Sequence, residues 1–579
     1  MKKLILIAII AMNALTGMSQ TAKTIKLKFV ETSDVHGCFF PYDFTNQRER
    51  GGSLARINHY VDQLRKTDPG VILLENGDIL QGQPINYFSN FVDTTHVNIA
   101  ARLIKYMKYD AHTWGNHDIE TGHSVYDAWA ANTGCPTLSA NIIDTRTGKN
   151  YTQPYAVFER QGIKIGVIGM LTPAIPSWLS TDLWSNLKFL DMVETARKYV
   201  KILKEQEHAD VIVGLFHSGR DGGIHTDDYD EDQTYDVARH VPGFDLIFYG
   251  HDHTRNLEWI NREDGGKVLI LNPANNAMYV AEADVEVTVK DSVITDKKVE
   301  GRIVDVRNTP VDETMVSLFQ NDIDLCNNFV RDEIGYFART IDTHDSFFGS
   351  SAFTDFIHRI QLEMTGADIS INAPLSFNAT IKKGPVHVSD MFNLYRYENK
   401  LCVLLMTGEE ILKHLERSYD LWANTMKSKD DYVVKLSQQT LNDNQRYGFT
   451  NLTFNFDSAA GIEYEVDVTK PDGKKVTIKK MSDGRKFDPE ATYKVAMNSY
   501  RANGGGELLT KGAGIPASEI PDRVIYRSKY DQRHYIIEYI KKHKNIDPKP
   551  LNNWRFVPKK WTKKAIERDK KLIFGKLID

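Results

Sequence analysis

The chain of 579 residues is longer than a single hydrophobic core usually grows, so its length predicts at least two domains. Its hydrophobic content of 41% and charged content of 26% are ordinary for a globular protein. A formal net charge of −5 argues against a nucleic-acid-binding surface built on bulk positive charge, so we expect a small-molecule partner and no nucleic-acid polymer.

The N-terminus has the layout of a secretory signal peptide. It reads MKKLILIAIIAMNALTGMSQ, with two lysines, an apolar run over residues 4–15, and then small and polar residues. The run is too short for a comfortable membrane span. We therefore expect a cleaved signal peptide over residues 1–20 and a periplasmic or secreted protein without stable membrane insertion. An uncleaved anchor and a buried N-terminal segment are the alternatives.

From residue 25 to about residue 306, strand-like segments alternate with segments of helical spacing. The expected helices lie at residues 54–65, 99–107 and 192–205, and the expected strands at residues 26–32, 71–78, 112–118, 164–171, 210–219, 245–254, 267–273 and 279–289. This alternation is typical of a layered α/β domain. In such domains functional groups collect at the carboxyl ends of the strands.

The second half of the chain has a different composition. Residues 309–336 carry apolar side chains at helical spacing and are expected to form one long linker helix. A mixed α+β domain is expected over residues 337–545, and a lysine-rich tail over residues 546–579 that packs down as a solvated helix rather than forming a nucleic-acid or membrane arm. With the signal peptide removed, the first domain would span residues 21–308.

Several strand ends of the first domain carry side chains of the kinds that bind metals. In chain order these are Asp34, His36, Asp78, Asn116, His117, His217, His251 and His253. Each has an ordinary explanation by itself, since an aspartate after a strand often caps a helix. Five such turns at one edge of a sheet instead favour a metal site.

The donor types indicate which metals and how many. Carboxylate, imidazole and amide oxygen suit zinc, manganese or iron, and the ligands are too many for one tetrahedral ion. Two ions sharing a carboxylate would hold a bridging hydroxide and clamp a phosphoryl oxygen, as in-line phosphoester hydrolysis requires. We therefore expect two divalent metal ions as cofactors.

Two sets of motifs resemble a known family. DVHG, GD, GNHD, FHSG and GHDH, in this order, resemble the signature of calcineurin-like metallophosphoesterases. SAFTDFI, LYRYENKL, MTGEEI and NSYRANGGG resemble the C-terminal domain of the secreted 5'-nucleotidase and 2',3'-cyclic-nucleotide 2'-phosphodiesterase/3'-nucleotidase family. The resemblance implies a calcineurin-like four-layer sandwich followed by a smaller α+β substrate-binding domain. It also implies an exported nucleotide phosphohydrolase that uses a metal-bridging hydroxide.

The resemblance also implies roles for individual residues. One ion would be held by Asp34, His36 and His253, the other by Asn116, His217 and His251, with Asp78 bridging both. His117 matches the family's catalytic histidine, which stabilises the transition state or protonates the leaving oxygen. Glu120 stands where many relatives have an aspartate that orients this histidine, and Asp118 is a further candidate for a supporting contact.

Two tyrosines match the rings between which this family stacks the nucleobase. They are Tyr397 and Tyr500, and Tyr395 competes with Tyr397 for the first position. A ring sandwich suits any base because every base offers an apolar face. The glycine-rich run with an arginine that many relatives carry near Asn372 is absent, so the phosphate contact of the second domain is not identified.

The sequence leaves several functions open. LYRYENKL and NSYRA favour the 2',3'-cyclic-nucleotide branch, whereas the GNHD context with Glu120 favours 5'-nucleotidases. A sugar-phosphate or other small phosphoesterase is an alternative in which the tyrosines are incidental. A non-catalytic nucleotide-binding protein on the same scaffold would have broken ligands, yet all seven are present. The sequence does not indicate the oligomeric state.

Overall fold

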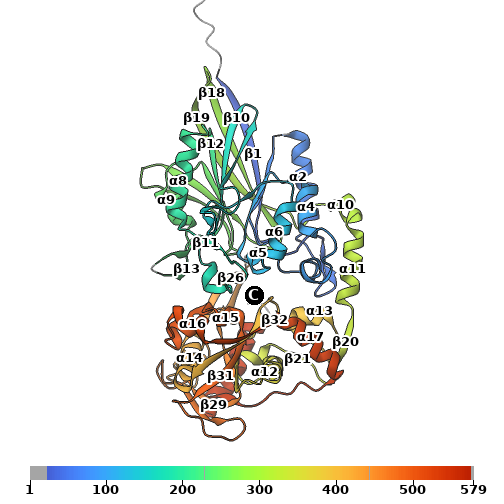
Figure 1. The fold of residues 1–579 in the computed structure, drawn as a ribbon, viewed down its shortest axis with the longest axis vertical. Helices are drawn as coiled ribbons and strands as arrows, with labels where there is room; N and C mark the ends of the chain where they lie inside the picture. The colour runs from blue at the N-terminus through green and yellow to red at the C-terminus, as the bar shows by residue number, and fades with distance from the viewer. Residues whose placement is uncertain (1–21, 69, 227, 442–443, 576–579) are drawn as a thin grey trace, which may run out of the picture.

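The computed structural model describes residues 22–68, 70–226, 228–441 and 444–575, which form two lobes (Figure 1). The expected signal peptide lies outside the described residues. Within the part of the chain that is described, no helix has both the length and the apolar character needed to cross a membrane.

The first lobe contains two six-stranded sheets that pack face to face. One has the order β19-β18-β1-β4-β5-β6 and the other β16-β17-β15-β12-β10-β9. The first comprises β1 (Lys23–Thr32), β4 (Ile72–Glu75), β5 (Ala111–Thr113), β6 (Thr137–Leu138), β18 (Tyr279–Lys290) and β19 (Val293–Asp305). The second comprises β9 (Tyr155–Arg160), β10 (Ile163–Leu171), β12 (Val211–His217), β15 (Leu246–Tyr249), β16 (Arg255–Asn261) and β17 (Lys267–Pro273).

Helices cover the outer face of each sheet. Those on the first sheet are α2 (Leu54–Thr67), α4 (Ile99–Met107) and α6 (His123–Asn132), and those on the second are α8 (Met192–Glu205) and α9 (Thr234–His240). Strand β1 is buried on both faces, since Leu27 and Phe29 pack between the sheets and Val30 packs under the helices. These four layers confirm the expected sandwich.

The second lobe is built on a five-stranded sheet of order β28-β22-β31-β25-β32. Its strands are β22 (Ile369–Asn372), β25 (Lys400–Thr407), β28 (Ser458–Ala460), β31 (Thr492–Asn498) and β32 (Val524–Asp531). Helices α12 (Ala352–Thr365), α14 (Gly408–Trp422) and α17 (Gln532–His543) pack around it. Helix α14 begins with a capping box between Thr407 and Glu410, in which each side chain accepts from the backbone amide of the other residue.

The linker differs from the single long helix expected over residues 309–336. It consists of α10 (Glu313–Leu318), α11 (Gln320–Val330) and strand β20 (Glu333–Phe337). The helices break at Phe319, whose ψ of 13° is not helical and whose ring packs against Phe40 and Tyr106. The last residues join β24 (Gly384–His387) as a strand, a pairing that the local spacing could not indicate.

Residues 546–579 are expected to form a tail separate from the second domain, but the described residues of this segment pack into that domain. Strand β34 (Trp554–Val557) pairs with β29 (Ile462–Asp467), and helix α18 (Lys559–Phe574) follows. Trp554, Phe556 and Ile573 are buried in the core of the second lobe. The tail therefore completes this lobe, because its apolar side chains fill the core while its lysines face outward.

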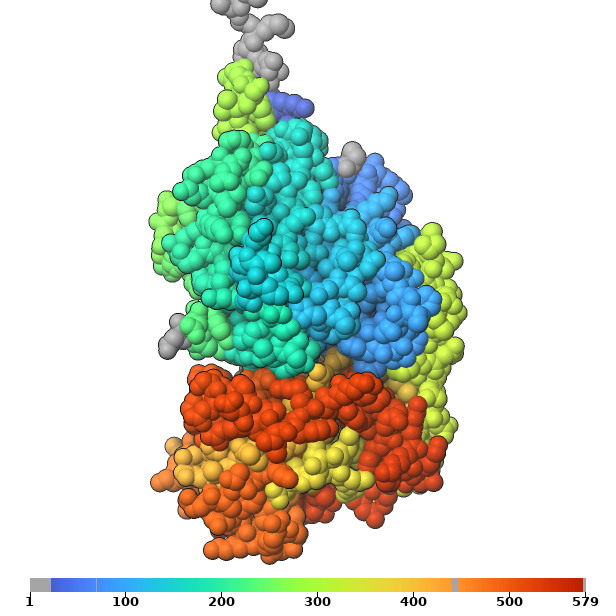
Figure 2. Space-filling model, in the orientation of Figure 1, coloured from blue at the N-terminus to red at the C-terminus, as the bar shows by residue number. Residues whose placement is uncertain are grey.

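The lobes meet along a seam, and α10 and α11 cross it on one side (Figure 2). Away from the linker, Lys400 Nζ lies 2.8 Å from Asp182 Oδ2, and Asn503 Nδ2 donates to Trp178 O at 3.2 Å. Between the lobes lies a cavity of about 1350 Å³ lined by residues of both. The expected site residues face this cavity or lie directly beneath its wall.

Candidate metal centre and nucleotide pocket

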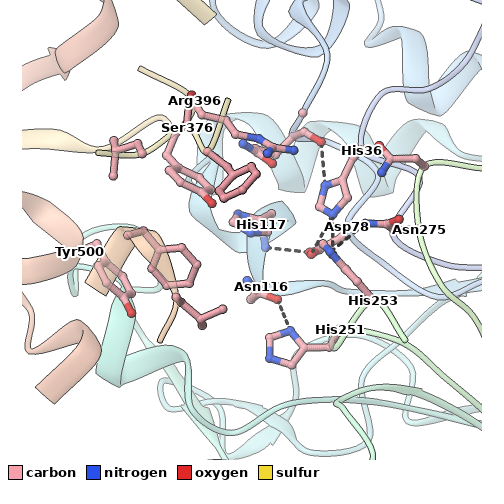
Figure 3. A pocket seen from close by; sticks show the side chains of 18 of the residues that line it. His36, Asp78, Asn116, His117, His251, His253, Asn275, Ser376, Arg396 and Tyr500 are labelled. Atoms are coloured by element: carbon pink, nitrogen blue, oxygen red, sulfur yellow. Dashed lines mark hydrogen bonds and ion pairs between the residues drawn. The ribbon is translucent and has the colours of Figure 1, made fainter. Parts of the chain in front are cut away.

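The strand ends of the first lobe converge on the cavity. β1, β4 and β5 run parallel in one sheet, and β10, β12 and β15 run parallel in the other. Carboxyl ends of parallel strands meet at one edge, so the turns after β1, β4 and β15 and the end of β12 lie together (Figure 3). Asn116 and His117 open the short helix α5 (Asn116–Glu120) after β5.

Many of these side chains are carried on unusual backbone. The φ angles are 52° at Asp34, 49° at His36, 58° at Asp78, 75° at His251 and 56° at His253. Positive φ is sparsely populated by residues with a side chain, and such conformations cluster at functional sites. The backbone is therefore shaped to aim these side chains inward.

The turn after β4 is fixed to α5 by a buried carboxylate. Asp118 accepts hydrogen bonds from the amides of Asp78, Leu80 and Gly115 at 2.8–2.9 Å. Gly115 approaches Asp78 so closely that a Cβ would overlap its amide and carboxylate. Asp118 thus holds the turn, while the contact with His117 is made by Glu120.

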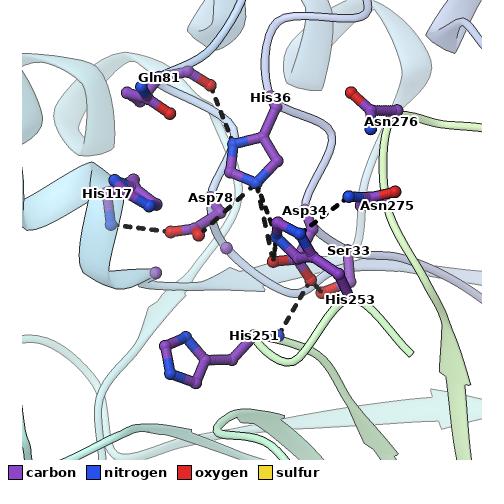
Figure 4. Close-up of polar contacts among 12 residues, drawn as sticks. Ser33, Asp34, His36, Asp78, Gln81, His117, His251, His253, Asn275 and Asn276 are labelled. Atoms are coloured by element: carbon purple, nitrogen blue, oxygen red, sulfur yellow. Dashed lines mark hydrogen bonds and ion pairs between the residues drawn. The ribbon is translucent and has the colours of Figure 1, made fainter. Parts of the chain in front are cut away.

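One group of ligand atoms gathers between His36, His253 and Asp34 (Figure 4). His36 Nδ1 lies 3.1 Å from the Gln81 carbonyl, which can only accept, so the proton is on Nδ1 and Nε2 carries a lone pair. His36 Nε2 lies 3.0 Å from His253 Nε2, which lies 3.2 Å from Asp34 Oδ1. Asp34 Oδ1 is buried without a hydrogen-bond partner. Imidazole nitrogens and a carboxylate oxygen that converge in this way can coordinate a cation.

A second group gathers around Asn116. His217 Nδ1 donates to the Asn76 carbonyl at 2.6 Å, which turns its Nε2 towards Asn116 Oδ1 at 3.1 Å and Asp78 Oδ2 at 3.4 Å. His251 Nδ1 lies 2.9 Å from the same Asn116 oxygen. Asp78 Oδ2 is also 3.9 Å from His36 Nε2, so this carboxylate stands between the two groups.

Glu231 supports His251 and was not found by sequence reasoning. Its Oε1 lies 3.0 Å from His251 Nε2, and its other oxygen accepts from the Ile224 amide at 2.7 Å. Asp232 lies close to both residues. Glu231 lies in the short strand β14 (Asp230–Asp232), within an acidic segment without recognisable ligand spacing, so only the fold reveals the contact.

The electrostatics of the cluster suit metal ligands. Burial alone would raise the pKa of Asp78, yet His217 and His117 hold it well below its usual value. The pKa of Asp34 is lowered likewise, by His217 and His253 against the effect of burial. Burial lowers the pKa of His36 to about 3. Against the effect of burial, Asp78 raises the pKa of His217, and Glu231 raises that of His251 to about 10. Ionised carboxylates and neutral imidazole are the forms that bind cations, so a cation bound at His251 would displace a proton from this ring.

His117 stands beside the cluster. Its amide donates to Asp78 Oδ1 at 2.8 Å, and its Nδ1 lies 2.6 Å from Glu120 Oε2. Burial opposes the charged form, but the charges of Asp78 and Glu120 raise its pKa to about 9. Glu120 thus contacts His117, and the raised pKa keeps a proton on this imidazole at neutral pH.

Three aromatic rings line the opposite wall. Tyr397 lies nearly parallel to His117 at 6.2 Å, and Tyr500 lines the same cavity. Phe454 meets both tyrosines nearly edge-on, at 6.3 Å and 78° from Tyr397 and at 6.1 Å and 84° from Tyr500. Tyr395 is fully buried and does not line the cavity, which leaves the partly buried Tyr397 as the ring that does. No sequence motif singled out Phe454.

Comparison with known families agrees with this arrangement. Residues 27–255 match the calcineurin-like phosphoesterase family, and residues 331–511 match the 5'-nucleotidase C-terminal domain. The chain belongs to the calcineurin-like phosphoesterases that carry a 5'-nucleotidase C-terminal domain. It is a metal-dependent phosphoric ester hydrolase of the nucleotidase and phosphodiesterase type, and its histidine and aspartate cluster is a divalent-metal site.

Several relatives match this phosphoesterase over nearly its whole length. It is 28% identical to the 2',3'-cyclic-nucleotide 2'-phosphodiesterase/3'-nucleotidase of Salmonella typhimurium, over 94% of this chain and 91% of that one. It is 26% identical to the trifunctional nucleotide phosphoesterase YfkN of Bacillus subtilis, over 94% of this chain but 40% of that protein. A Staphylococcus aureus protein in complex with alpha-ketoglutarate has the same fold, with a TM-score of 0.75, 23% identity and coverage of 92% and 100%.

Proposed function

We propose that this phosphoesterase hydrolyses 2',3'-cyclic nucleotides and nucleoside 3'-phosphates at two divalent ions. The observation that carries the proposal is the convergence of imidazole, carboxylate and amide groups opposite a wall of aromatic rings. In this proposal one ion is held by Asp34, His36 and His253, the other by Asn116, His217 and His251, and both by Asp78.

Such ions supply an activated water and neutralise phosphoryl charge when bound. A side chain of the protein, His117, donates a proton to the leaving group. Glu120 holds Nδ1 of His117, so Nε2 is left to give its proton to the departing ribose oxygen. After the transfer, the Nδ1 proton remains bonded to Glu120, which keeps the ring in place. A positioned proton donor of this kind contributes about 10²- to 10⁴-fold to the rate.

In the same proposal, Tyr397 and Tyr500 bind the nucleobase between their rings, and Phe454 closes the back of the slot. The rings are on one lobe and the metal ligands on the other. Catalysis therefore requires the lobes to close on the nucleotide, and their opening releases products.

The Salmonella typhimurium relative, which matches nearly the full length of both chains, supports the cyclic-nucleotide branch because it is named for that activity. A 5'-nucleotidase is the second candidate, since the second lobe matches the C-terminal domain of 5'-nucleotidases. The chemistry at the ions is the same for both.

A comparison of rates tests the proposal. The purified protein, supplied with manganese or zinc, is assayed on adenosine 5'-monophosphate, adenosine 3'-monophosphate and 2',3'-cyclic adenosine monophosphate. We expect turnover of the last two. Selective turnover of the 5'-ester would instead establish the second candidate, and background rates on all three with metal bound would refute both.

We further propose zinc, manganese or iron as the ions, because the donors combine imidazole with oxygen and include no thiolate. Metal analysis of the protein as purified tests this. We also propose export, on the basis of the leader-like sequence of residues 1–20. N-terminal sequencing of protein recovered outside the cytoplasm would show cleavage near residue 20.

A further inference from the structure

The substrate phosphate has no identified protein contact in the second lobe, but the cavity contains arginines that the motifs did not indicate. They are Arg48, Arg50, Arg307, Arg396 and Arg417. Arg48 lies 3.9 Å from Asp43, and Arg307 lies 2.6 Å from Asp305. Within the described residues, the guanidinium groups of Arg50 and Arg396 have neither a carboxylate partner nor a hydrogen bond.

Arg50 belongs to the first lobe. It follows strand β3 (Arg48–Glu49), and its backbone amide is fixed to Pro41 O at 3.2 Å. Its side chain lines the cavity, and its Nε is buried without a hydrogen-bond partner. A buried donor left unpaired costs free energy. Arg50 is thus prepared for an acceptor that enters the cavity.

Arg396 belongs to the second lobe, in the turn between α13 (Val388–Leu394) and β25. The turn is held from beneath by the buried Arg533, which donates to Tyr395 O at 3.0 Å, to Arg396 O at 2.7 Å and to Glu398 Oε1 at 2.9 Å. The backbone of Arg396 is therefore fixed while its guanidinium is free. Figure 3 shows this side chain reaching towards His36.

The two arginines line the cavity beside the metal cluster. The same cavity is lined by the proposed ligands His36, Asp78 and His253. Two guanidinium groups from opposite lobes thus face the space into which the ligand set opens.

We propose that Arg50 and Arg396 form an arginine pair that binds the oxygens of the substrate phosphate left free by the metal ions. Guanidinium groups bind phosphate through charge-assisted, bidentate hydrogen bonds. The inference rests on the proposed function and adds its phosphate contacts. Because each lobe supplies one arginine, a phosphate held by both also favours closure of the cleft.

The arginine pair distinguishes substrates by charge. A phosphate monoester carries a charge of about −1.5 to −2 at pH 7, whereas a cyclic diester carries a single charge. Loss of either arginine should therefore lower kcat/KM more for hydrolysis of a phosphate monoester than for hydrolysis of a cyclic diester.

Kinetics of Arg50→Ala, Arg396→Ala and the double variant test the proposal. For adenosine 3'-monophosphate and p-nitrophenyl phosphate we expect kcat/KM to fall roughly tenfold to hundredfold for each arginine. Inhibition by inorganic phosphate should weaken similarly, with a smaller loss for the cyclic nucleotide. Inhibition by adenosine should stay unchanged, since it has no phosphate.

Arg48→Ala is the matched control, because it removes the same charge from a side chain that is 74% exposed in the same cavity. Arg396→Lys keeps the charge and should recover part of the loss, and equal thermal unfolding midpoints would show that the variants fold. Wild-type kcat/KM and phosphate inhibition in both alanine variants would overturn the arginine pair. If the wild type hydrolyses only p-nitrophenyl phosphate and the variants lose this activity, the nucleotide function fails and the arginine pair stands.

Discussion

At the residue scale, the histidines of the cluster differ in the group that binds the ring nitrogen facing away from the proposed metal ion. Backbone carbonyls hold His36 and His217, whereas the Glu231 carboxylate holds His251. A carboxylate behind a histidine fixes the ring and raises its basicity. The affinity for the ion next to His251 should therefore depend on Glu231, which can be substituted without changing any proposed ligand.

Glu231→Gln should weaken metal binding about tenfold to hundredfold, since the amide no longer supplies a charge to His251. Metal titration followed by calorimetry would measure this directly, without reference to turnover. Glu263→Gln, an exposed substitution on the same lobe, serves as control. Unchanged metal affinity in Glu231→Gln would contradict the supporting role.

His117→Asn should lower kcat on adenosine 3'-monophosphate by about 10²- to 10⁴-fold, because the ribose oxygen leaves poorly without a proton. The loss on p-nitrophenyl phosphate should be much smaller, since that leaving group needs no proton. Glu120→Gln should give a weaker version of the same pattern. Equal losses on both substrates would argue that His117 acts on the phosphoryl group instead.

Sequence reasoning found the residues that follow strand ends, because a strand, a turn and a metal-binding side chain are local features. Glu231 and Phe454 could not be found in this way, since each acts through a contact with a distant segment. Arg396 stands next to the predicted Tyr397, yet its significance depends on what faces it across the cleft.

At the scale of elements, helix α12 is joined to its sheet through a buried histidine. His358 Nδ1 lies 2.8 Å from Ser370 Oγ on β22, and Nε2 lies 3.2 Å from Ser458 Oγ on β28. Burial lowers the pKa of His358 to about 3. The helix and two strands thus share a group that must stay neutral when folded.

This predicts acid sensitivity of the second lobe. Between about pH 6.5 and pH 3 the unfolded chain binds a proton at His358 that the folded chain does not, so stability falls as pH falls. The slope is about 1.4 kcal/mol per pH unit below pH 6.5. His358→Gln should be less stable at pH 7 but lose less on acidification. Urea unfolding of both proteins at pH 7 and pH 5 measures this, and parallel losses would contradict it.

The linker shows why element boundaries escaped prediction. Apolar spacing continues through Phe319 and into β20, so the local pattern reads as one helix. The break and the strand both depend on partners distant in sequence, Phe40 for the ring and β24 for the strand. The strands and helices of the first lobe were predicted well because each carries its own periodicity.

At the scale of the whole molecule, we propose that the second domain runs from the linker to residue 574 and includes β34 and α18. Deleting residues 546–579 should prevent the second lobe from folding, because the core loses Trp554 and Phe556. Phe556→Ala alone should cost about 3–5 kcal/mol. Thermal unfolding would show loss of one transition in the deletion, and metal binding by the first lobe should persist. A second lobe that unfolds normally without the tail would contradict this boundary.

The division of the site between two lobes has a consequence for the order of events after hydrolysis. In the proposed reaction on a nucleoside 3'-phosphate, the freed nucleoside is held by the aromatic rings of the second lobe. Inorganic phosphate is held by the ions and Arg50 of the first lobe once opening withdraws Arg396. When the cleft opens, each product therefore stays bound to a different lobe. Opening itself separates the pair and prevents them from recombining in place.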